Sequence, residues 1–525
     1  MRRSLVIVGL CLPLAVLSGG SSATAHGPAA QSRPSVSPSP TAHDYNGDGY
    51  ADLAIGIPGQ RVNGHARAGA VEVIYGSHNG LQPAGNQLWT VDSAGIPGKA
   101  AANDLFGWAV ASGDFNDDGY DDLAIGSPGH GSFFDGVNHP KSGAVYVLFG
   151  GAHGLRVRSS YIVEVGAAGY EYGYALAVTD MLDANGPGRG GDGYADLAVG
   201  APGKSWVYVR SGLDISHRPN HYGEFATSAG AAGTARLGAS LAAGTFTSAG
   251  PAIAVGAPLA DVPVGSSVAS QAGQVVVIDG VSPMVTLTQS SFGGNPAEPG
   301  DHFGAALAAA DADGSGYDDL YIGVPGEDLT SSIGDNAVNA GAVQLMFTDS
   351  GGGFSTAGWT IHQAFSGVPG DNAEGDQFGD SLAVGRVDGN SSVDLVVGIP
   401  GKQIRGHAGA GAVDVLLNGG MGLPANIGNQ QWTQNSAGVS DAAETGDRFG
   451  AAISLGQFGH GSGLDLAIGV PGEDLSGKSN AGAVQVLYGG GVSGPGSAGD
   501  QLWSADSPGI LGSTHAGNQF GVSVR

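Results

Sequence analysis

A sequence repeat with a period of roughly 70 residues constrains this chain more than any other feature. A large apolar residue followed by Gly, and then by small and aliphatic residues, occurs seven times. The pairs begin at Phe106, Tyr172, Leu237, Phe303, Phe378, Phe449 and Phe520. The steps between them are 66, 65, 66, 75, 71 and 71 residues, so we expect one structural unit per repeat.

Each repeat contains further short apolar segments that are typical of β-strands. A second segment, such as DLAIGSPG at 122–129, begins at Asp52, Asp122, Asp196, Ala252, Asp319, Asp394 and Asp465. A third segment covers 68–76, 142–150, 340–347, 410–419 and 481–489, and a fourth, with Trp or Phe, covers 87–90, 359–365, 430–433 and 501–504. Four such segments per repeat predict a four-stranded antiparallel blade, in which we expect the Trp side chains to pack.

The two ends of the repeat region predict that the blades close into a ring. The first repeat begins at Asp44 and lacks a Phe-Gly strand, whereas residues 520–525 are such a strand with nothing after it. The main alternative is an open solenoid, but the two fragments add up to one complete blade, and radial stacking hides the strand edges. The sequence therefore predicts an all-β, seven-bladed β-propeller, closed by pairing of the C-terminal strand with the strand after Asp52.

The N-terminal region predicts export. Arg2 and Arg3 precede an apolar stretch at 5–17 and a small-x-small cleavage site at 23–25, so residues 1–25 are expected to be a signal peptide. Residues 26–43 are rich in Pro, Ser and Ala and predict a linker, which leaves 44–525 for the propeller. The single cysteine, Cys11, lies in the leader, and no later segment is apolar enough to span a membrane. We expect a secreted, extracellular protein.

The charge of the chain disfavours nucleic acid as a partner. The formal net charge of −27 becomes −29 when a leader containing two arginines and no acid is removed. Such a surface repels phosphate backbones. Where the carboxylates cluster, cation binding is the better interpretation.

Three of the turns between the first two strands of a repeat carry a pattern that suits a metal ion. They read DYNGDGYAD (44–52), DFNDDGYDD (114–122) and DADGSGYDD (311–319). Oxygen-bearing side chains occupy positions 1, 3, 5 and 9, position 6 is Gly, and position 7 is a Tyr that offers its backbone carbonyl. Ca²⁺ prefers six to eight such oxygens in a bendable loop. The predicted ligands are Asp44, Asn46, Asp48, Tyr50 and Asp52; Asp114, Asn116, Asp118, Tyr120 and Asp122; and Asp311, Asp313, Ser315, Tyr317 and Asp319.

The remaining four turns depart from this pattern. The third repeat keeps Asp180 and a DGYAD segment with Asp192 and Asp196, separated by a Gly-rich insertion in which Asp183 or Asn185 could fill position 3. The sixth repeat has Arg386 at position 1, which would repel a cation. The turns at 245–252 and 457–465 lack the carboxylates at positions 1, 3 and 5. We therefore expect three Ca²⁺ sites, with Asp180, Asp192 and Asp196 as a weaker fourth.

The repeat marks resemble those of a known family. Each Phe-Gly pair is matched by a Gly-x-Pro mark that begins at Gly56, Gly126, Gly200, Gly256, Gly323, Gly398 and Gly469. These paired marks resemble the FG-GAP repeat family, best known from the N-terminal propellers of integrin α subunits. The resemblance implies the propeller fold, and it implies Ca²⁺ in the three Asp-rich turns, which are similar to the family loop residue by residue. The large apolar residue is expected to wedge between blades.

One motif suggests catalysis, but the equivalent segments of the other repeats explain it as part of a blade. Residues 379–382 read Gly-Asp-Ser-Leu, as in the opening block of one esterase class, yet the other repeats place FGWAVA, LGASLA and FGAALA in the same slot. Ser381 is then an ordinary blade residue, equivalent to Ser240 and Ser523. No nucleophile elbow, phosphate-binding loop or HExxH motif occurs, so we do not expect an enzyme.

The leading hypothesis is an extracellular binding or adhesion module. The longest variable loops follow the second strand of each repeat and are expected to share one face: 59–68, 129–142, 257–273, 326–340 and 401–409. Loops on a rigid scaffold are where recognition usually occurs, and an extracellular protein or glycan is the expected partner of a monomer. The alternatives are a hydrolase or lyase at the mouth of the central channel, and a purely structural coat component.

Overall fold

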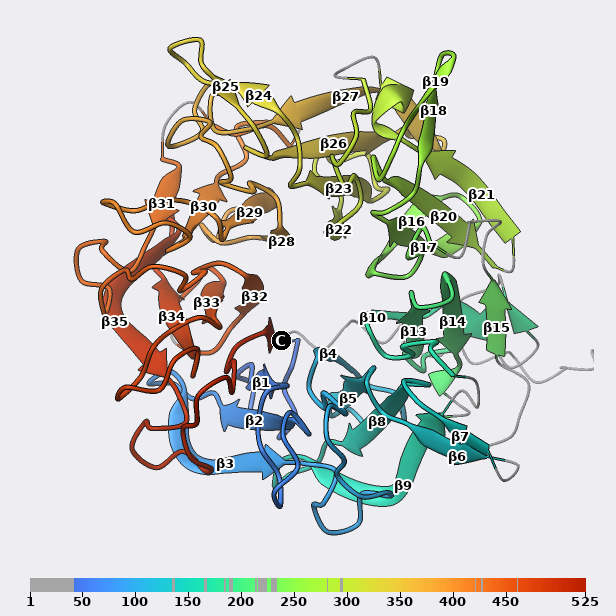
Figure 1. The fold of residues 1–525 in the computed structure, drawn as a ribbon, viewed down its shortest axis with the longest axis vertical. Helices are drawn as coiled ribbons and strands as arrows, with labels where there is room; N and C mark the ends of the chain where they lie inside the picture. Colours follow the sequence, from blue (N-terminus) through green and yellow to red (C-terminus); the bar gives the residue numbers. More distant parts are fainter. Residues whose placement is uncertain are drawn as a thin grey trace, which may run out of the picture. The chain divides into compact units, whose positions relative to one another are not determined.

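The computed structural model describes residues 42–525, except 135–136, 165–167, 184–185, 188–191, 213–214, 216–223, 228–233, 281, 293–295, 421, 426–427 and 460. The predicted signal peptide and residues 26–41 of the predicted linker lie outside this range. Residues 38–525 form one compact unit. Within it, seven four-stranded antiparallel sheets surround a central axis, which confirms the predicted seven-bladed β-propeller (Figure 1).

The blades are numbered in chain order, and each sheet runs from an innermost to an outermost strand. The innermost strands of blades 1 to 7 are β36 (Ser523–Val524), β4 (Ala109–Gly113), β10 (Leu176–Thr179), β16 (Ser240–Thr247), β22 (Leu307–Ala310), β28 (Ser381–Gly385) and β32 (Ala452–Gly456). The second strands are β1 (Leu53–Ile57), β5 (Asp122–Ser127), β13 (Asp196–Ala201), β17 (Gly250–Ala257), β23 (Asp319–Val324), β29 (Asp394–Ile399) and β33 (Asp465–Val470).

The outer half of each blade follows the same order. The third strands are β2 (Ala70–Tyr75), β8 (Ala144–Phe149), β14 (Trp206–Arg210), β20 (Gln274–Asp279), β26 (Ala342–Thr348), β30 (Ala412–Leu416) and β34 (Ala483–Gly489). The outermost are β3 (Gln82–Trp89), β9 (Arg156–Glu164), β15 (Glu224–Thr227), β21 (Ser282–Leu287), β27 (Phe354–Ile361), β31 (Gln430–Trp432) and β35 (Pro495–Trp503).

In the described residues, four small two-stranded sheets and one short 3-10 helix lie outside the seven blades. The sheets are β6 (Ser132–Phe134) with β7 (Val137–His139), β11 (Leu182–Asp183) with β12 (Gly186–Pro187), β18 (Val262–Val264) with β19 (Ser267–Ala269), and β24 (Leu329–Thr330) with β25 (Asn336–Ala337). The helix η1 spans Gln289–Phe292. No helix in the described part of the chain has the length and apolar character needed to cross a membrane.

The apolar runs of the sequence form the middle of each blade. Strands β1, β2, β5 and β8 are buried at every residue, as expected for strands that are covered on both faces. The outermost strand β3 is instead partly exposed. The hydrophobic core therefore lies between neighbouring blades: Val71 and Val73 of blade 1 share one cluster with Phe106 and Leu123 of blade 2.

The ring closes as the sequence predicts. Strand β36 pairs antiparallel with β1, with Ile55 opposite Val524 and Gly56 opposite Ser523. The backbone amide of Ala54 donates to the Arg525 carbonyl at 2.8 Å, and the amide of Arg525 donates to the Ala54 carbonyl at 3.0 Å. The C-terminal segment thus supplies the innermost strand of the first blade.

The two glycine marks of each repeat meet across the junctions between blades. A Cβ on Gly56 would lie 2.0 Å from the carbonyl oxygen of Gly107, which is the Phe-Gly glycine of the next blade. Gly107 itself has a φ of 84°. The same close approach recurs at Gly126, Gly200, Gly256, Gly323, Gly398 and Gly469. Any side chain there would force adjacent blades apart, which explains the glycines.

The apolar residue before each Phe-Gly glycine is the predicted wedge. Phe106, Tyr172, Leu237, Phe303, Phe378 and Phe449 are fully buried, and Phe520 is 1% exposed. Phe106 also donates its backbone amide to the Ala68 carbonyl of the preceding blade at 3.1 Å. The wedge therefore joins blades through both its ring and its backbone.

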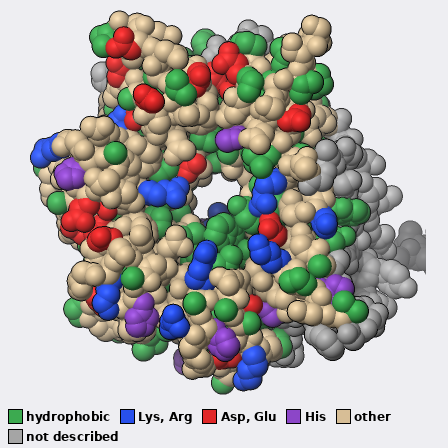
Figure 2. Space-filling model, in the orientation of Figure 1, with side chains coloured by type: hydrophobic (Ala, Val, Ile, Leu, Met, Phe, Trp, Pro, Cys, Tyr) green, Lys and Arg blue, Asp and Glu red, His purple; other side chains and the backbone are tan. Residues whose placement is uncertain are grey.

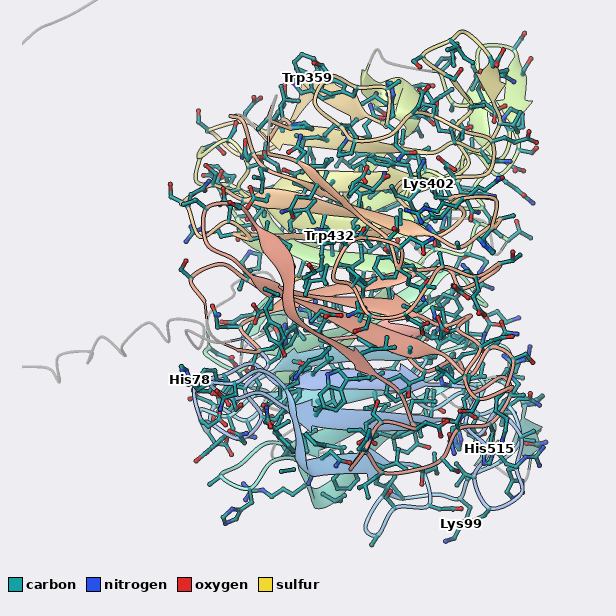
Figure 3. The ribbon with its side chains drawn as sticks, turned by 90° about the vertical axis from the view of Figure 1, so that its left-hand side faces the viewer. His78, Lys99, Trp359, Lys402, Trp432 and His515 are labelled. Atoms are coloured by element: carbon teal, nitrogen blue, oxygen red, sulfur yellow. The ribbon has the colours of Figure 1, made fainter. Side chains whose placement is uncertain are left out.

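Because the blades are antiparallel, their connections divide between two faces. The hairpins between innermost and second strands lie on one side, here named the hairpin face, together with the turns between third and outermost strands. The loops that follow the second strands lie on the other side, here named the loop face, with the segments that lead into each Phe-Gly pair. Figure 3 shows His78 at the hairpin face and Lys99, Lys402 and His515 at the loop face.

Candidate functional site

The three predicted metal hairpins share a turn that is organised by the acid at position 1. Asp44 accepts hydrogen bonds from the backbone amides of Gly47 (2.6 Å), Asp48 (3.1 Å) and Gly49 (2.9 Å). Asp114 does the same with Asp118 (3.1 Å) and Gly119 (2.8 Å), and Asp311 with Gly314 (2.8 Å), Ser315 (3.0 Å) and Gly316 (3.0 Å). The carboxylate is therefore held inside the turn.

Positions 3 and 5 are oriented by short backbone contacts in the same turns. Asn46 accepts the amide of Asp48 at 2.8 Å, and Asp313 accepts the amide of Ser315 at 2.9 Å. The residue at position 5 accepts the amide of the Tyr at position 7: Asp48 from Tyr50, Asp118 from Tyr120, and Ser315 from Tyr317, at 3.0, 3.2 and 3.3 Å. These side chains all carry oxygen atoms, which are the ligands that Ca²⁺ prefers.

The acid at position 9 has a structural role that the sequence did not reveal. Asp52 accepts the backbone amides of Tyr45 and of Gly76, the latter at the end of β2, both at 2.9 Å. Asp122, Asp196, Asp319, Asp394 and Asp465 form the equivalent pair of contacts, and all six are fully buried. Two of these blades have no metal pattern, so position 9 clamps the blade in its own right. The metal prediction therefore depends on positions 1, 3 and 5.

The fifth hairpin brings three carboxylates within reach of one ion. Oxygens of Asp311, Asp313 and Asp319 all lie within 4.8 Å of one another. That spacing suits a single Ca²⁺ with ligands at 2.3–2.6 Å.

The second hairpin contains an orphaned oxygen beside its buried acid. Asn116 donates its Nδ2 to both carboxylate oxygens of Asp122, at 3.2 and 3.0 Å, while its buried Oδ1 has no hydrogen-bond partner. Rotation of the amide by 180° would exchange Oδ1 and Nδ2 and turn Oδ1 toward the Asp122 carboxylate. A cation bound to Asp122 would need an oxygen at that position. The donor set of this turn therefore fits Ca²⁺.

The electrostatics of the hairpins also favour a cation. Burial, together with the carboxylates of Asp44 and Asp48, raises the pKa of Asp52 to about 8, against two backbone hydrogen bonds that lower it. Burial likewise raises the pKa of Asp122 well above its usual range and that of Asp319 to about 6. Ionisation of these buried acids therefore costs free energy in the folded state unless a cation is bound beside them.

The weaker candidate in the third repeat is only partly described. Asp192 accepts the amide of Tyr194 at 3.0 Å, and Asp196 is the clamp of its blade. Burial raises the pKa of Asp196 to about 7, and the Asp180 carboxylate adds to this rise. Asn185, one of the two candidates for position 3, lies outside the described residues.

The central channel has an apolar lining. A cavity of about 450 Å³ is bounded by Ala, Leu and Val side chains of the innermost strands, with His43, Ser454, Gln457 and Arg525 as polar members. The hydrolase or lyase hypothesis needs acids, His or Arg that converge on this axis. Of these residue types, the described lining of this cavity contains His43 and Arg525.

The serine of the esterase-like motif is an ordinary blade residue, as its siblings indicate. The Ser381 hydroxyl donates to the Gly450 carbonyl at 2.7 Å. Ser240 and Ser523 donate to the Gly304 and Gly107 carbonyls at 2.6 and 3.0 Å. All three bridge to the Phe-Gly glycine of the next blade.

The loop face holds an aromatic groove near the mouth of the channel. A cavity of about 390 Å³ lies between blades 2 and 3 and is lined by Trp108, Tyr174, Arg67, Lys141 and Glu171, among others. The rings of Trp108 and Tyr174 are 5.4 Å apart, and the Arg236 guanidinium lies 4.8 Å from the centre of the Tyr174 ring. Figure 2 shows Lys and Arg side chains around the channel mouth on this face. The loops 59–68 and 129–142 both reach the groove, through Arg67, Gly129 and Lys141.

One buried acid has no functional explanation and supports a stability prediction. Glu72 on β2 is fully buried, and neither carboxylate oxygen has a hydrogen-bond partner. Burial raises its pKa to about 8, opposed only in part by the Leu511 backbone amide. The equivalent positions in blades 5 and 7 hold Gln344 and Gln485.

We expect Glu72→Gln to stabilise the protein at neutral pH. The folded state holds this proton more tightly than the unfolded state, whose pKa is near 4.5, so the wild type loses stability as the pH rises from 4.5 to 8. The variant lacks this slope and gains about 3 kcal/mol of unfolding free energy at pH 7. Thermal midpoints at pH 4.5 and 8 check this: an equal gain at both values would contradict it. Glu374→Gln, at an exposed site, is the control.

Comparison with known families supports the repeat assignment. The FG-GAP repeat model matches residues 39–74, 106–148 and 303–346. These are the repeats that contain the three Asp-rich hairpins at 44–52, 114–122 and 311–319.

Two groups of relatives share part of the chain. The phosphatidylinositol-glycan-specific phospholipase D of Mus musculus is 36% identical over 164 residues, which is 31% of this chain and 18% of that protein. Integrin alpha-6 of Gallus gallus is 31% identical over 179 residues, 33% of this chain and 14% of that protein. The similarity thus spans less than a fifth of these relatives' own length.

A solved structure shows a weaker likeness: a rhamnogalacturonan lyase from Bacillus licheniformis aligns with a TM-score of 0.33 and 12% identity, over 88% of this chain and 71% of that chain. The repeat matches and the seven closed blades carry the assignment instead. This chain is a seven-bladed β-propeller with FG-GAP repeats at 39–74, 106–148 and 303–346, and part of it is similar to integrin alpha chains.

Proposed function

We propose that this chain is a secreted, calcium-stabilised binding module that recognises an acidic glycan on its loop face. The observation that carries this proposal is the groove in which Trp108 and Tyr174 stand beside Arg67, Lys141 and Arg236. The predicted signal peptide at 1–25 supports secretion. The expected state is a monomer without nucleic-acid partners.

Calcium has a structural role in this proposal. Three ions are held by the side chains of Asp44, Asn46, Asp48 and Asp52, of Asp114, Asn116, Asp118 and Asp122, and of Asp311, Asp313, Ser315 and Asp319. The backbone carbonyls of Tyr50, Tyr120 and Tyr317 complete them, and Asp180, Asp192 and Asp196 form the weaker fourth set. The buried acids and the orphaned Asn116 oxygen support this assignment. Since the hairpin face is opposite the groove, the ions fix the blades and do not contact the ligand.

The chemistry of the groove suits a sugar acid. The apolar face of a pyranose packs on aromatic rings, and a guanidinium binds a carboxylate through two parallel hydrogen bonds. Arg236 is already positioned, because its Nη1 lies 3.0 Å from Glu171 Oε2 while its guanidinium covers Tyr174. In a chain with a net charge of −27, cations gathered at one mouth favour an anionic ligand there.

Affinity electrophoresis in gels that contain alginate, polygalacturonate or neutral dextran tests the proposal. We expect retardation by an acidic polysaccharide and none by dextran. Trp108→Ala is expected to weaken binding by about tenfold or more, as for a central aromatic anchor. Trp359→Ala is the matched control, because Trp359 is 41% exposed on the outermost strand β27. Equal retardation of both variants would contradict the groove as the binding site.

A further inference from the structure

A set of polar side chains recurs at three junctions between consecutive blades on the loop face: 4 to 5, 5 to 6 and 6 to 7. It consists of an acid two residues before the Phe of a Phe-Gly pair, the residue that follows Gly-x-Pro-Gly, and a Gln just after the preceding outermost strand. We name this set the junction triad. Between blades 5 and 6 it is Asp376, Lys402 and Gln363. The Lys402 Nζ lies 2.7 Å from Asp376 Oδ2 and 3.0 Å from Gln363 Oε1. An ammonium cation thus holds a carboxylate and an amide oxygen together.

Between blades 6 and 7 the triad has lost its cation. Asp447 and Gln434 occupy the equivalent places, but Glu473 stands where Lys402 stands in the previous junction. Asp447, Gln434 and Glu473 are 1%, 1% and 2% exposed. Oxygens of Glu444, Asp447 and Glu473 lie within 4.8 Å of one another. Buried like charges at this spacing are costly unless a cation joins them.

The side-chain amide of Gln434 indicates that a cation is missing from this junction. Its Nε2 donates to Glu473 Oε2 at 2.6 Å, so the amide lies directly on the acidic cluster. Its Oε1 is buried and has no hydrogen-bond partner. In the previous junction the same atom of Gln363 accepts the Lys402 ammonium. The structure therefore keeps an oxygen ligand at a place where the sister junction holds a positive charge.

The junction between blades 4 and 5 repeats this substitution independently. Its triad is Asp301, Glu327 and Gln289, each no more than 2% exposed. Gln289 donates its Nε2 to Glu327, and its Oε1 is again buried without a partner. The backbone amide of Glu298 donates to Asp301 Oδ2 at 2.5 Å, so this carboxylate is held beside the other two residues. Two junctions out of the seven thus exchange a basic or neutral residue for Glu and keep an orphaned amide oxygen.

We propose that the junction of blades 6 and 7 binds a divalent cation through Asp447, Glu473, Glu444 and Gln434, in the place that the Lys402 ammonium takes one junction earlier. The junction of blades 4 and 5 binds a second cation through Asp301, Glu327 and Gln289. An all-oxygen set of carboxylates and an amide selects a hard ion such as Ca²⁺. These sites lie on the loop face, opposite the hairpin sites. A junction ion would connect two adjacent blades, whereas a hairpin ion would connect two strands of one blade.

Equilibrium dialysis of the mature chain with ⁴⁵Ca²⁺ tests the proposal. We expect Glu473→Lys to bind one ion fewer than the wild type, because its ammonium takes the place of the metal, and Glu327→Lys to do the same at the other junction. Glu473→Gln keeps the size of the side chain, removes one charge, and should weaken the site by about tenfold. Glu374→Lys makes the same change of charge at an exposed position and should leave the count unchanged.

The outcomes are distinct from those of the hairpin sites. In chelator, the Glu473→Lys variant should melt at a higher temperature than the wild type, since it carries its own cation. Variants of the hairpin acids should lose other ions and leave the junction ions bound. If Glu473→Lys and Glu473→Gln both bind as many ions as Glu374→Lys, with the same affinity, the junction does not hold a metal.

Discussion

We expect loss of the three hairpin ions in chelator to lower the thermal midpoint of the mature chain by roughly 8 °C. One ion at a free concentration of about 100 times its Kd stabilises the fold by about 2.7 kcal/mol, so three hairpin ions contribute about 8 kcal/mol. A folded unit of this size has an unfolding entropy near 1 kcal/mol/K, at about 2.1 cal/mol/K per residue. Without the ions, the buried carboxylates of the three hairpins face one another, and the turns lose their cross-links. Differential scanning calorimetry in calcium and in chelator measures the shift.

The calcium shift should grow with pH. In the ion-free fold, burial raises the pKa of Asp52 to about 8 and that of Asp319 to about 6, above the value of 3.8 expected in the unfolded chain. The ion-free fold therefore binds more protons than the unfolded chain, and its stability falls as the pH rises through this range. Because Ca²⁺ displaces these protons, its stabilising effect should be larger at pH 8 than at pH 5.

A matched pair of variants separates a lost ligand from a disturbed turn. Asp313→Ala removes the position 3 oxygen of the fifth hairpin and should remove about a third of the calcium shift. Asp313→Asn places there the residue that the other two hairpins already use, Asn46 and Asn116, and should leave the shift nearly intact. If both variants behave alike, or if chelator leaves the wild-type midpoint unchanged, the hairpins hold no structural calcium.

Removing residues 520–525 should open the ring and destabilise the whole propeller. The truncation deletes the innermost strand of blade 1 and the wedge Phe520, which is 1% exposed and packs in one cluster with Ile55 and Val484. Loss of a buried Phe side chain alone costs about 3–5 kcal/mol. The truncation also removes the backbone pairs with β1 and exposes the edge of that strand. We expect a midpoint at least 10 °C lower, by about the same entropy as above, and a tendency to aggregate.

A peptide in trans provides the control for this experiment. A synthetic peptide of residues 515–525 should restore much of the lost midpoint, because it can pair with the exposed edge of β1 through the contacts of β36. A scrambled peptide should not. A truncated chain that melts like the wild type would show that closure contributes little to stability.

The fold could be predicted because the residues that determine a blade lie close together in the sequence and recur in every repeat. The apolar runs of β1 and β5 are buried throughout, and the Phe-Gly and Gly-x-Pro glycines meet at every junction. The fragments at the two ends predicted the pairing of β36 with β1. The two-stranded sheets such as β18 with β19 were not predicted, since their short segments sit inside variable loops without a repeated pattern.

The candidate sites were harder to predict, because they depend on contacts between blades. The Asp at position 9 is a predicted metal ligand, but the sequence did not show its second role: Asp394 and Asp465 accept backbone amides in the same way in turns without the metal pattern. The groove joins Trp108 to Tyr174, 66 residues away, and no single repeat shows that pair. The junction acids were visible only by comparing Glu327, Lys402 and Glu473 across repeats. That comparison requires knowing which side chains meet.

Because the Asp at position 9 holds its blade through backbone amides, a hairpin can gain or lose its metal ion while the blade stays the same. Because Asp465 secures its blade in a turn without the other acids, the scaffold tolerates the loss of an ion at any one hairpin. Conversely, three side-chain exchanges at positions 1, 3 and 5 of a turn would install an ion without rebuilding the strands behind it. Substitutions in these turns can therefore change how strongly the stability of such chains depends on the metal ions around them, while the geometry of the ring stays the same.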